Sequence, residues 1–296
     1  MSIVRALARP ALAAVASAGV YAALRAGGPG LGSRWERTNH AGRTVTLLEG
    51  PAFVAGAALA SVLPVGPRTG GPRPRAAALV AVLGSGAFGA LDDLAGSGSA
   101  KGLRGHVGSA LSGQITTGLV KIVGLGLTGL LAAGLADPAA RHGRHHRAGA
   151  GGMPRALLGG ALIAGSANIA NLLDLRPGRA LKGVILASAP MALSGGTAGA
   201  GARCASAAAG AAVGVLSPDL RGEAMLGDTG ANAAGAMVGL ALHQRLGPAG
   251  RAAAVGVVVA LTLASERVSF TRVIEATPVL RELDAWGRAP GPRSWP

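Results

Sequence analysis

Long apolar segments separated by shorter polar ones constrain this chain more than any other feature. A helix crosses a bilayer core of about 30 Å with roughly 20 apolar residues, in a range of about 17–25. Nine segments of the 296-residue chain approach that length. They lie at about residues 3–25, 50–65, 75–91, 117–135, 153–173, 181–196, 201–217, 229–246 and 249–265. The pattern predicts an all-α, polytopic integral membrane protein with about nine transmembrane helices, in a range of about 8–10.

The composition supports helices packed in lipid rather than a soluble core. Hydrophobic residues make up 50% of the chain, charged residues 14% and aromatic residues 2%, whereas soluble domains carry roughly 25% charged residues. The apolar residues are mainly Ala, Gly, Val and Leu, and small residues let helix backbones approach closely in a membrane. The single cysteine, Cys204, excludes an intramolecular disulfide and a cysteine-based zinc site.

The net charge of +15 raises the question of nucleic-acid binding. The basic residues are mostly arginines scattered between apolar segments, without the interleaved aromatic residues of a nucleic-acid surface. We therefore expect no nucleic-acid partner, and we assign the loop cations to anionic lipid headgroups.

The acidic residues predict the topology. If nine helices alternate in direction, twelve acids fall on one side of the membrane and only Asp137 falls on the other. The acidic side also carries the larger number of Lys and Arg residues, which favours the cytoplasm. We expect one transmembrane domain over 1–265, a cytoplasmic tail over 266–296, and a location in the plasma membrane. The twelve acids are Glu36, Glu49, Asp92, Asp93, Asp174, Asp219, Glu223, Asp228, Glu266, Glu275, Glu282 and Asp284.

Two polar clusters follow the third apolar segment. Asp92 and Asp93 come directly after it, and adjacent carboxylates at a membrane helix end are costly unless they are paired or bind a metal. The alternative is a helix end that has reached water. Lys101 follows in the next loop, and Lys121 lies just inside the fourth segment, where it either contacts an anion or snorkels to the surface.

Two further motifs lie later in the chain. Asn168, Asn171 and Asp174 are spaced by three residues, which places them on one stripe of a helix. Such a stripe must face a protein interior or a wet cavity, and interhelical hydrogen bonding is the alternative. Gly227-Asp228-Thr229-Gly230 opens the eighth segment, where Asp228 either approaches a phosphate or metal or is an ordinary helix N-cap.

Asp92, Asp93, Asp174 and Asp228 all project on the same side in the nine-helix topology. Mg²⁺ prefers hard oxygen ligands and is usually held by one or two carboxylates together with phosphates and water. Clustered Asp, Lys and Asn residues at a bilayer surface therefore predict phosphoryl chemistry on a membrane-bound substrate.

These motifs, in this order, resemble the polyprenyl-phosphate N-acetylhexosamine-1-phosphate transferase superfamily. The resemblance covers roughly residues 36–240 and includes Asp92-Asp93, the Lys-Gly-Leu sequence that begins at Lys101, and Lys121. It continues with the Asn-x-x-Asn-x-x-Asp stripe that ends at Asp174 and the Gly-Asp-x-Gly sequence around Asp228. Residues 39–45 and Gly50 are similar to the first cytoplasmic loop of the family.

The resemblance implies Mg²⁺-dependent transfer of a sugar-1-phosphate from a UDP-sugar to polyprenyl phosphate in cell-envelope glycan biosynthesis. Asp228 and one of Asp92 and Asp93, by preference Asp92, would hold Mg²⁺. The other of the pair would position or deprotonate the lipid phosphate. Lys101 and Lys121 would offset phosphate charge. Asn168, Asn171 and Asp174 would line the nucleotide site or support the metal. A homodimer is a further partner that the sequence leaves open.

The chain departs from the family pattern after Asp174. The family continues with Asp-Gly-x-Asp-Gly, whereas Pro177 stands here at the second Asp position. We expect Arg176 and Arg179 to take part in substrate binding instead, by gripping a phosphate; the alternative is that they face lipid headgroups. The alternative function is a non-catalytic relative that binds lipid-linked phosphate as a scaffold or regulator. A transporter is disfavoured because the chain shows no clear internal repeat.

Overall fold

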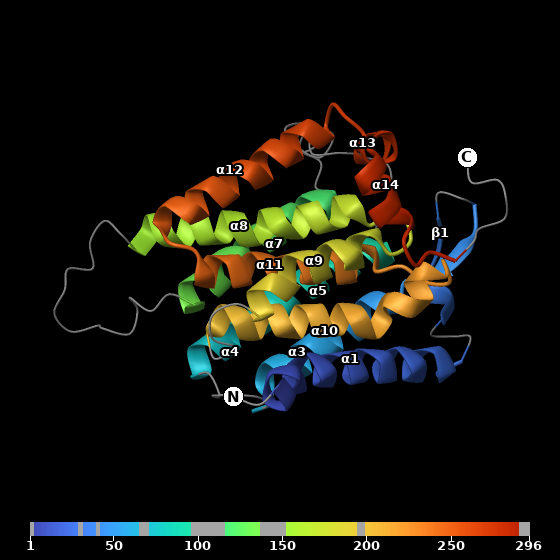
Figure 1. Ribbon diagram of the computed structural model, residues 1–296, viewed down its shortest axis with the longest axis horizontal. Helices are drawn as coiled ribbons and strands as arrows, with labels where there is room; N and C mark the ends of the chain where they lie inside the picture. Colours follow the sequence, from blue (N-terminus) through green and yellow to red (C-terminus); the bar gives the residue numbers. More distant parts are fainter. Residues whose placement is uncertain are drawn as a thin grey trace.

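The computed structural model describes residues 3–28, 32–39, 42–64, 71–95, 116–136, 152–193 and 199–289. Within these ranges the chain forms one helical bundle with a small two-stranded hairpin at one end (Figure 1). This confirms the all-α class. The helices that run along the bundle are α1 (Ile3–Ala26), α3 (Glu49–Val62), α7 (Thr117–Ala136), α8 (Gly152–Leu173), α9 (Arg179–Leu193), α10 (Ala200–Leu220), α11 (Gly227–Arg245) and α12 (Pro248–Ser265), together with the continuous run α4 (Pro72–Leu79), η2 (Val80–Gly84) and α5 (Ser85–Ala95).

Each predicted apolar segment coincides with one of these helical runs, but nine membrane crossings are not confirmed. In the described part of the chain, six runs are long and apolar enough to cross a membrane. Helices α3 and α9 have 14 and 15 residues, which is short for a 30 Å core. Helix α11 has 19 residues but carries Asp228, Asn232, His243 and Arg245, which lower its hydropathy.

Helix α11 lies at the centre of the bundle, which explains its polar residues. Its buried residues run almost without interruption from Gly227 to Ala241. Helices α3, α5, α8 and α10 all pack against it. A helix enclosed by other helices presents little surface to lipid, so its own sequence need not be strongly apolar.

Small residues set the spacing of the helices around α11. A Cβ atom on Gly235 would lie 2.2 Å from the carbonyl oxygen of Ser166 in α8. A Cβ atom on Gly89 would lie 2.2 Å from the carbonyl oxygen of Asp228. Since real side chains do not approach backbone so closely, glycine at these positions permits the contacts of α11 with α8 and α5.

The hairpin attaches to the connection that leads into α11. Strands β1 (Glu36–Thr38) and β2 (Thr44–Thr46) pair antiparallel. The N–H of Thr46 donates to the carbonyl of Glu223, and the N–H of Met225 donates to the carbonyl of Thr46. The short helix η1 (Ser33–Trp35) is bound to the same region, because Leu47 N–H donates to the carbonyl of Trp35.

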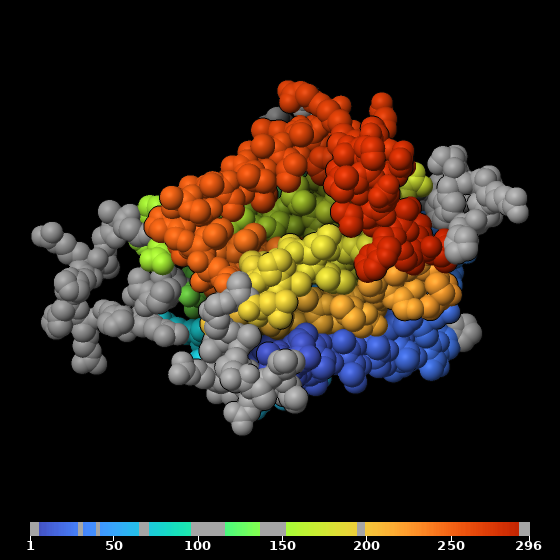
Figure 2. All heavy atoms as spheres, in the orientation of Figure 1, coloured from blue at the N-terminus to red at the C-terminus, as the bar shows by residue number. Residues whose placement is uncertain are grey.

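The chain ends with two short helices, α13 (Phe270–Ala276) and α14 (Pro278–Ala285). They lie at the same end of the bundle as the hairpin (Figure 1). The space-filling view shows this red segment covering parts of α9 and α10 (Figure 2).

The close approach of α11 to α8 makes a testable prediction. Gly235→Ala forces a Cβ atom against backbone, and overpacking of this kind costs about 1–3 kcal/mol. Gly126→Ala in α7 is the control, since nothing lies within 4 Å of the added Cβ. Alanine is otherwise favoured over glycine in a helix by about 0.5–1 kcal/mol. Thermal unfolding in detergent should show a lower melting temperature for Gly235→Ala only, and equal melting temperatures would contradict this packing.

Candidate functional site

Two acids and one lysine from three helices form the centre of the site. The Nζ atom of Lys121 in α7 lies 2.6 Å from Oδ2 of Asp92 in α5 and 2.7 Å from Oδ2 of Asp228 in α11. The three side chains are 16–17% exposed, so they are partly shielded but open to a ligand. Because two carboxylates face one ammonium, the cluster carries a net charge of about −1 when all three are ionised.

Asp93 points in a different direction from Asp92 and binds the start of α11. Its Oδ1 accepts a hydrogen bond from the N–H of Asp228 at 3.0 Å. Its Oδ2 accepts from the N–H of Thr229 at 2.8 Å and from the Thr229 hydroxyl at 2.7 Å. The side chain is fully buried, with Arg37 of the hairpin 3.9 Å from Oδ1.

Asp174 binds the same helix terminus from the other side. The backbone N–H of Gly227 hydrogen-bonds to the Asp174 carboxylate. Burial, and then the charge of Asp219, raise the pKa of Asp174 well above its usual value, while the Gly227 hydrogen bond acts in the opposite direction. The Asp219 carboxylate in turn accepts a hydrogen bond from the backbone N–H of Gly178. Both acids line a cavity of about 20 Å³, which is room for about one water molecule.

Four of the acids at this end of the bundle therefore form two pairs. Asp93 and Asp174 together accept from the N–H groups of Gly227, Asp228 and Thr229, which have no partner inside the helix. Asp92 and Asp228 contact Lys121. The first pair fixes the start of α11, and the second pair holds the Lys121 ammonium at a partly exposed position.

Glycines permit this arrangement at the start of α11. Gly227 has φ +60°, and a Cβ there would lie 2.9 Å from Oδ2 of Asp93. A Cβ on Gly50 would lie 2.4 Å from the carbonyl oxygen of Leu226. Gly50 thus lets α3, and Gly227 lets α5, approach the helix terminus closely.

The predicted stripe on α8 is divided between two cavities. Asn168 and Asn171 line a cavity of about 380 Å³ together with Lys121. Asp174 does not line this cavity, because α8 ends at Leu173 and the chain turns away. The structure therefore brings the two amides, but not Asp174, to the Lys121 cluster.

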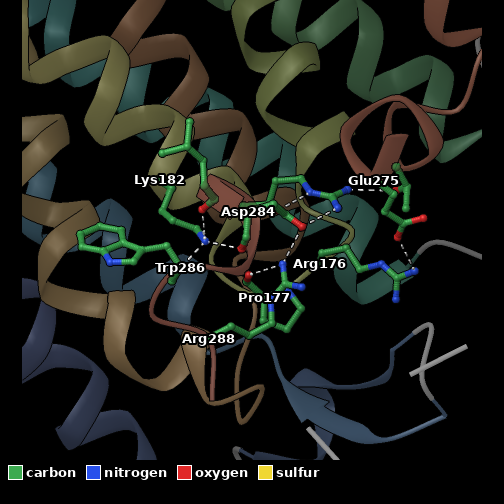
Figure 3. Close-up of polar contacts among 10 residues, drawn as sticks. Arg176, Pro177, Lys182, Glu275, Asp284, Trp286 and Arg288 are labelled. Atoms are coloured by element: carbon green, nitrogen blue, oxygen red, sulfur yellow. Dashed lines mark hydrogen bonds and ion pairs between the residues drawn. The ribbon is translucent and has the colours of Figure 1, made fainter. Parts of the chain in front are cut away.

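Arg176 and Arg179 both contact the C-terminal segment. Arg179 is buried, and it binds Asp284 through two hydrogen bonds of 2.8 and 3.0 Å and the hydroxyl of Thr271 at 2.9 Å. The Nη2 atom of Arg176 lies 3.6 Å from Oε1 of Glu275 (Figure 3). A phosphate would have to displace Asp284 to reach Arg179, so the predicted role of these arginines in substrate binding stays a prediction.

Two further cations, Lys182 and Arg288, contact the same segment. We call Arg179, Lys182, Asp284 and Arg288 together the tail clamp. Lys182 donates to the backbone carbonyls of Leu283 and Asp284 in the last turn of α14 and to that of Trp286, the residue after the helix (Figure 3). Arg288 donates to Asp284 at 2.8 Å and to the carbonyl of Pro177 at 3.3 Å. The clamp thus holds the C-terminal segment against the connection between α8 and α9, which also carries Asp174.

One predicted site residue, Lys101, lies outside the described residues. Four other polar residues were not identified as site residues from the sequence: Glu49, Asp219, Asn232 and Asp284. Asn232 stands one helical turn after Asp228, which is a usable signal. Glu49 and Asp219 sit at the ends of apolar segments and resemble ordinary helix termini, although they are 0% and 2% exposed.

The residues present fit Mg²⁺ only in combination with a ligand. In the described part of the chain, no group of three or more His, Cys, Asp or Glu side chains could hold a metal ion. Mg²⁺ commonly takes one or two carboxylates and completes its shell with phosphates and water. Asp92 and Asp228 supply two carboxylates, and one oxygen of each lies within 2.7 Å of the Lys121 ammonium.

Comparison with known proteins gives no assignment, since no family model and no curated protein matches the chain.

The tail clamp makes a prediction about Arg179. Arg179→Ala leaves Asp284 without its main partner, and breaking a buried ion pair costs about 3–5 kcal/mol. We expect a lower melting temperature and faster cleavage of residues 270–289 by chymotrypsin. Arg281→Ala, which removes an exposed arginine of α14, should behave like the wild type. Unchanged stability and cleavage in Arg179→Ala would contradict the clamp.

The clamp also predicts a dependence on pH. Burial alone would raise the pKa of Asp284, but hydrogen bonds and charges from Arg179 and Arg288 outweigh it, so the pKa lies below its usual value. A lowered pKa in the folded state stabilises docking above the unfolded pKa of about 4, and this stabilisation is lost as the pH falls below it. Pulses of pepsin should cleave the segment increasingly below about pH 4. The Asp284→Asn variant should not show this increase in cleavage at low pH. An increase with the same midpoint in that variant would show that another group is responsible.

Proposed function

We propose that this chain is a membrane phosphoglycosyltransferase that moves a sugar-1-phosphate from a UDP-sugar to polyprenyl phosphate and releases UMP. The observation that carries the proposal is the meeting of Asp92, Lys121 and Asp228 from three helices at one end of the bundle. These residues belong to three of the motifs on which the family resemblance rests. We place this end of the bundle at the cytoplasmic face of the plasma membrane, in accordance with the distribution of Lys and Arg.

The site contains carboxylates and a cation, which are the kinds of group that phosphoryl transfer uses. Such a reaction depends mainly on positioning and on neutralising charge at the phosphoryl oxygens. Lys121 would move from its carboxylate partners to a phosphate of the donor, since it also lines the adjoining cavity. Asp92 and Asp228 would then face a cation. Mg²⁺, when bound there, would neutralise charge on the diphosphate.

Asp93 and Asp174 take a positioning role in this proposal. Their oxygens already accept hydrogen bonds from the start of α11, so they hold Asp228 in place rather than contact substrate. This role differs from the one that the family resemblance implies for Asp93, namely contact with the lipid phosphate. The two roles are separable, because a positioning residue acts on stability as well as on rate.

A second candidate function is a non-catalytic relative that binds lipid-linked phosphate. The observation in its favour is that Arg179 and Lys182 are engaged in the tail clamp, so the described part of the chain offers few cations for a second phosphate. Such a protein would bind polyprenyl phosphate but release no UMP.

The two functions are distinguished by an assay in membranes that contain the expressed protein. Radiolabelled UDP-sugars and undecaprenyl phosphate are supplied with and without Mg²⁺, and label in the lipid fraction is measured. Asp228→Asn removes a charge with little change of volume, and we expect it to lower turnover by about 10²-fold or more. Glu223→Gln, which neutralises an exposed acid paired with Arg221, is the control. Label transfer by the Asp228→Asn variant at the wild-type rate would remove Asp228 from the reaction, and no transfer by the wild type with any UDP-sugar would favour the binding relative.

A further inference from the structure

A cavity beside Lys121 has polar walls, and the proposed roles of Asp92, Lys121 and Asp228 do not fill it. It has a volume of about 380 Å³ and lies between α7, α8, α11 and α12. Lys121 lines it, so it adjoins the cluster with Asp92 and Asp228. Pockets of about 300–1,000 Å³ hold small molecules, and a few polar groups in their walls fix the orientation.

Asn232 is the residue in this wall that most requires a ligand. It is 1% exposed, and neither its Oδ1 nor its Nδ2 has a hydrogen-bond partner among the described residues. A buried amide normally forms hydrogen bonds, and leaving it unpaired is unfavourable. Asn232 follows Asp228 by one turn of α11, so the two side chains lie on the same face of the helix.

Besides Lys121 and the acid Glu266, the other polar residues of the cavity wall bear neutral groups. Asn168 and Asn171 come from α8, and Thr262 and Ser265 come from α12. Asn168 Nδ2 donates to the Thr262 hydroxyl at 3.2 Å, which leaves the remaining capacity of both groups for a ligand. Amides and hydroxyls both donate and accept. They therefore complement a neutral ligand that does the same, whereas a hydrocarbon chain would leave Asn232 unpaired and a phosphate offers acceptors alone.

We infer that this cavity binds the hydroxyl-bearing sugar ring of the nucleotide sugar, and that Asn232 is a residue that determines specificity for it. The inference rests on the proposed function, because the phosphate next to the sugar would lie at Lys121. Asn232 hydrogen-bonds to the polar substituents of the ring through its amide, and the amides of Asn168 and Asn171 in α8 line the same cavity. Sugars with different substituents would then differ in affinity, while the nucleotide itself would not contact Asn232.

The test compares Asn232→Leu with the wild type in lipid nanodiscs. Binding of UDP, UDP-glucose, UDP-galactose, UDP-N-acetylglucosamine and UDP-N-acetylgalactosamine is measured by calorimetry with Mg²⁺. We expect the variant to bind the preferred UDP-sugar about tenfold more weakly, which corresponds to one lost hydrogen bond, and to bind UDP with unchanged affinity. Ser188→Ala in α9 is the control, because Ser188 is also buried and its hydroxyl has no partner in the described part of the chain, but it does not line the cavity.

The outcomes separate this inference from the proposed function. If the wild type binds UDP-sugars and Asn232→Leu binds them equally well, the sugar does not contact Asn232, although the proposed function stands. If the wild type binds neither UDP nor any of the UDP-sugars, both proposals are overturned. Asn232→Ser serves if the leucine variant does not fold, and it should weaken UDP-sugar binding in the same direction.

Discussion

The N-terminus of α11 lies inside the bundle, and the rest of the site depends on how its backbone groups are satisfied there. The first N–H groups of any helix have no partner within the helix, and burial removes the water that would otherwise serve them. Asp93 and Asp174 supply the acceptors for these groups. The position of Asp228 follows from this anchoring, because its own N–H is one of the anchored groups. Asp228 is thereby directed towards Lys121 and Asp92.

The C-terminal segment adds a second constraint at the same end of the molecule. The tail clamp binds the start of α9 and the connection between α8 and α9. That connection carries Asp174 and also Gly178, whose N–H donates a hydrogen bond to the Asp219 carboxylate. The hairpin binds the connection between α10 and α11 from another side. The loops around Asp174 and Asp228 are therefore held by segments that are far from them in sequence.

The sequence predicts the helices well because each apolar segment is long enough to define its own helix. It also predicts that Asp92, Lys121 and Asp228 lie on one side of the membrane, and the structure brings them into contact. It cannot separate the roles of Asp92 and Asp93, because neighbouring residues point about 100° apart on a helix and the direction of each depends on the packing of α5. Asp174 fits the spacing of the stripe on α8, but the helix ends one residue earlier. The pairing of Arg179 with Asp284 joins residues 105 positions apart, so no local pattern reveals it.

The most direct measurement of this division of the acids is thermal unfolding of Asp93→Asn and Asp228→Asn, each in EDTA and in Mg²⁺ with UDP. A ligand that binds only the folded state raises stability by about 2.7 kcal/mol at 100 times its Kd. Asp93→Asn should melt below the wild type in EDTA, since it loses an acceptor for the start of α11, and should keep the stabilisation by Mg²⁺ and UDP. Asp228→Asn should melt like the wild type in EDTA, because Lys121 retains Asp92, and should lose that stabilisation. The reverse pattern would show that Asp93 faces the ligand and that Asp228 anchors the fold, and would contradict the account.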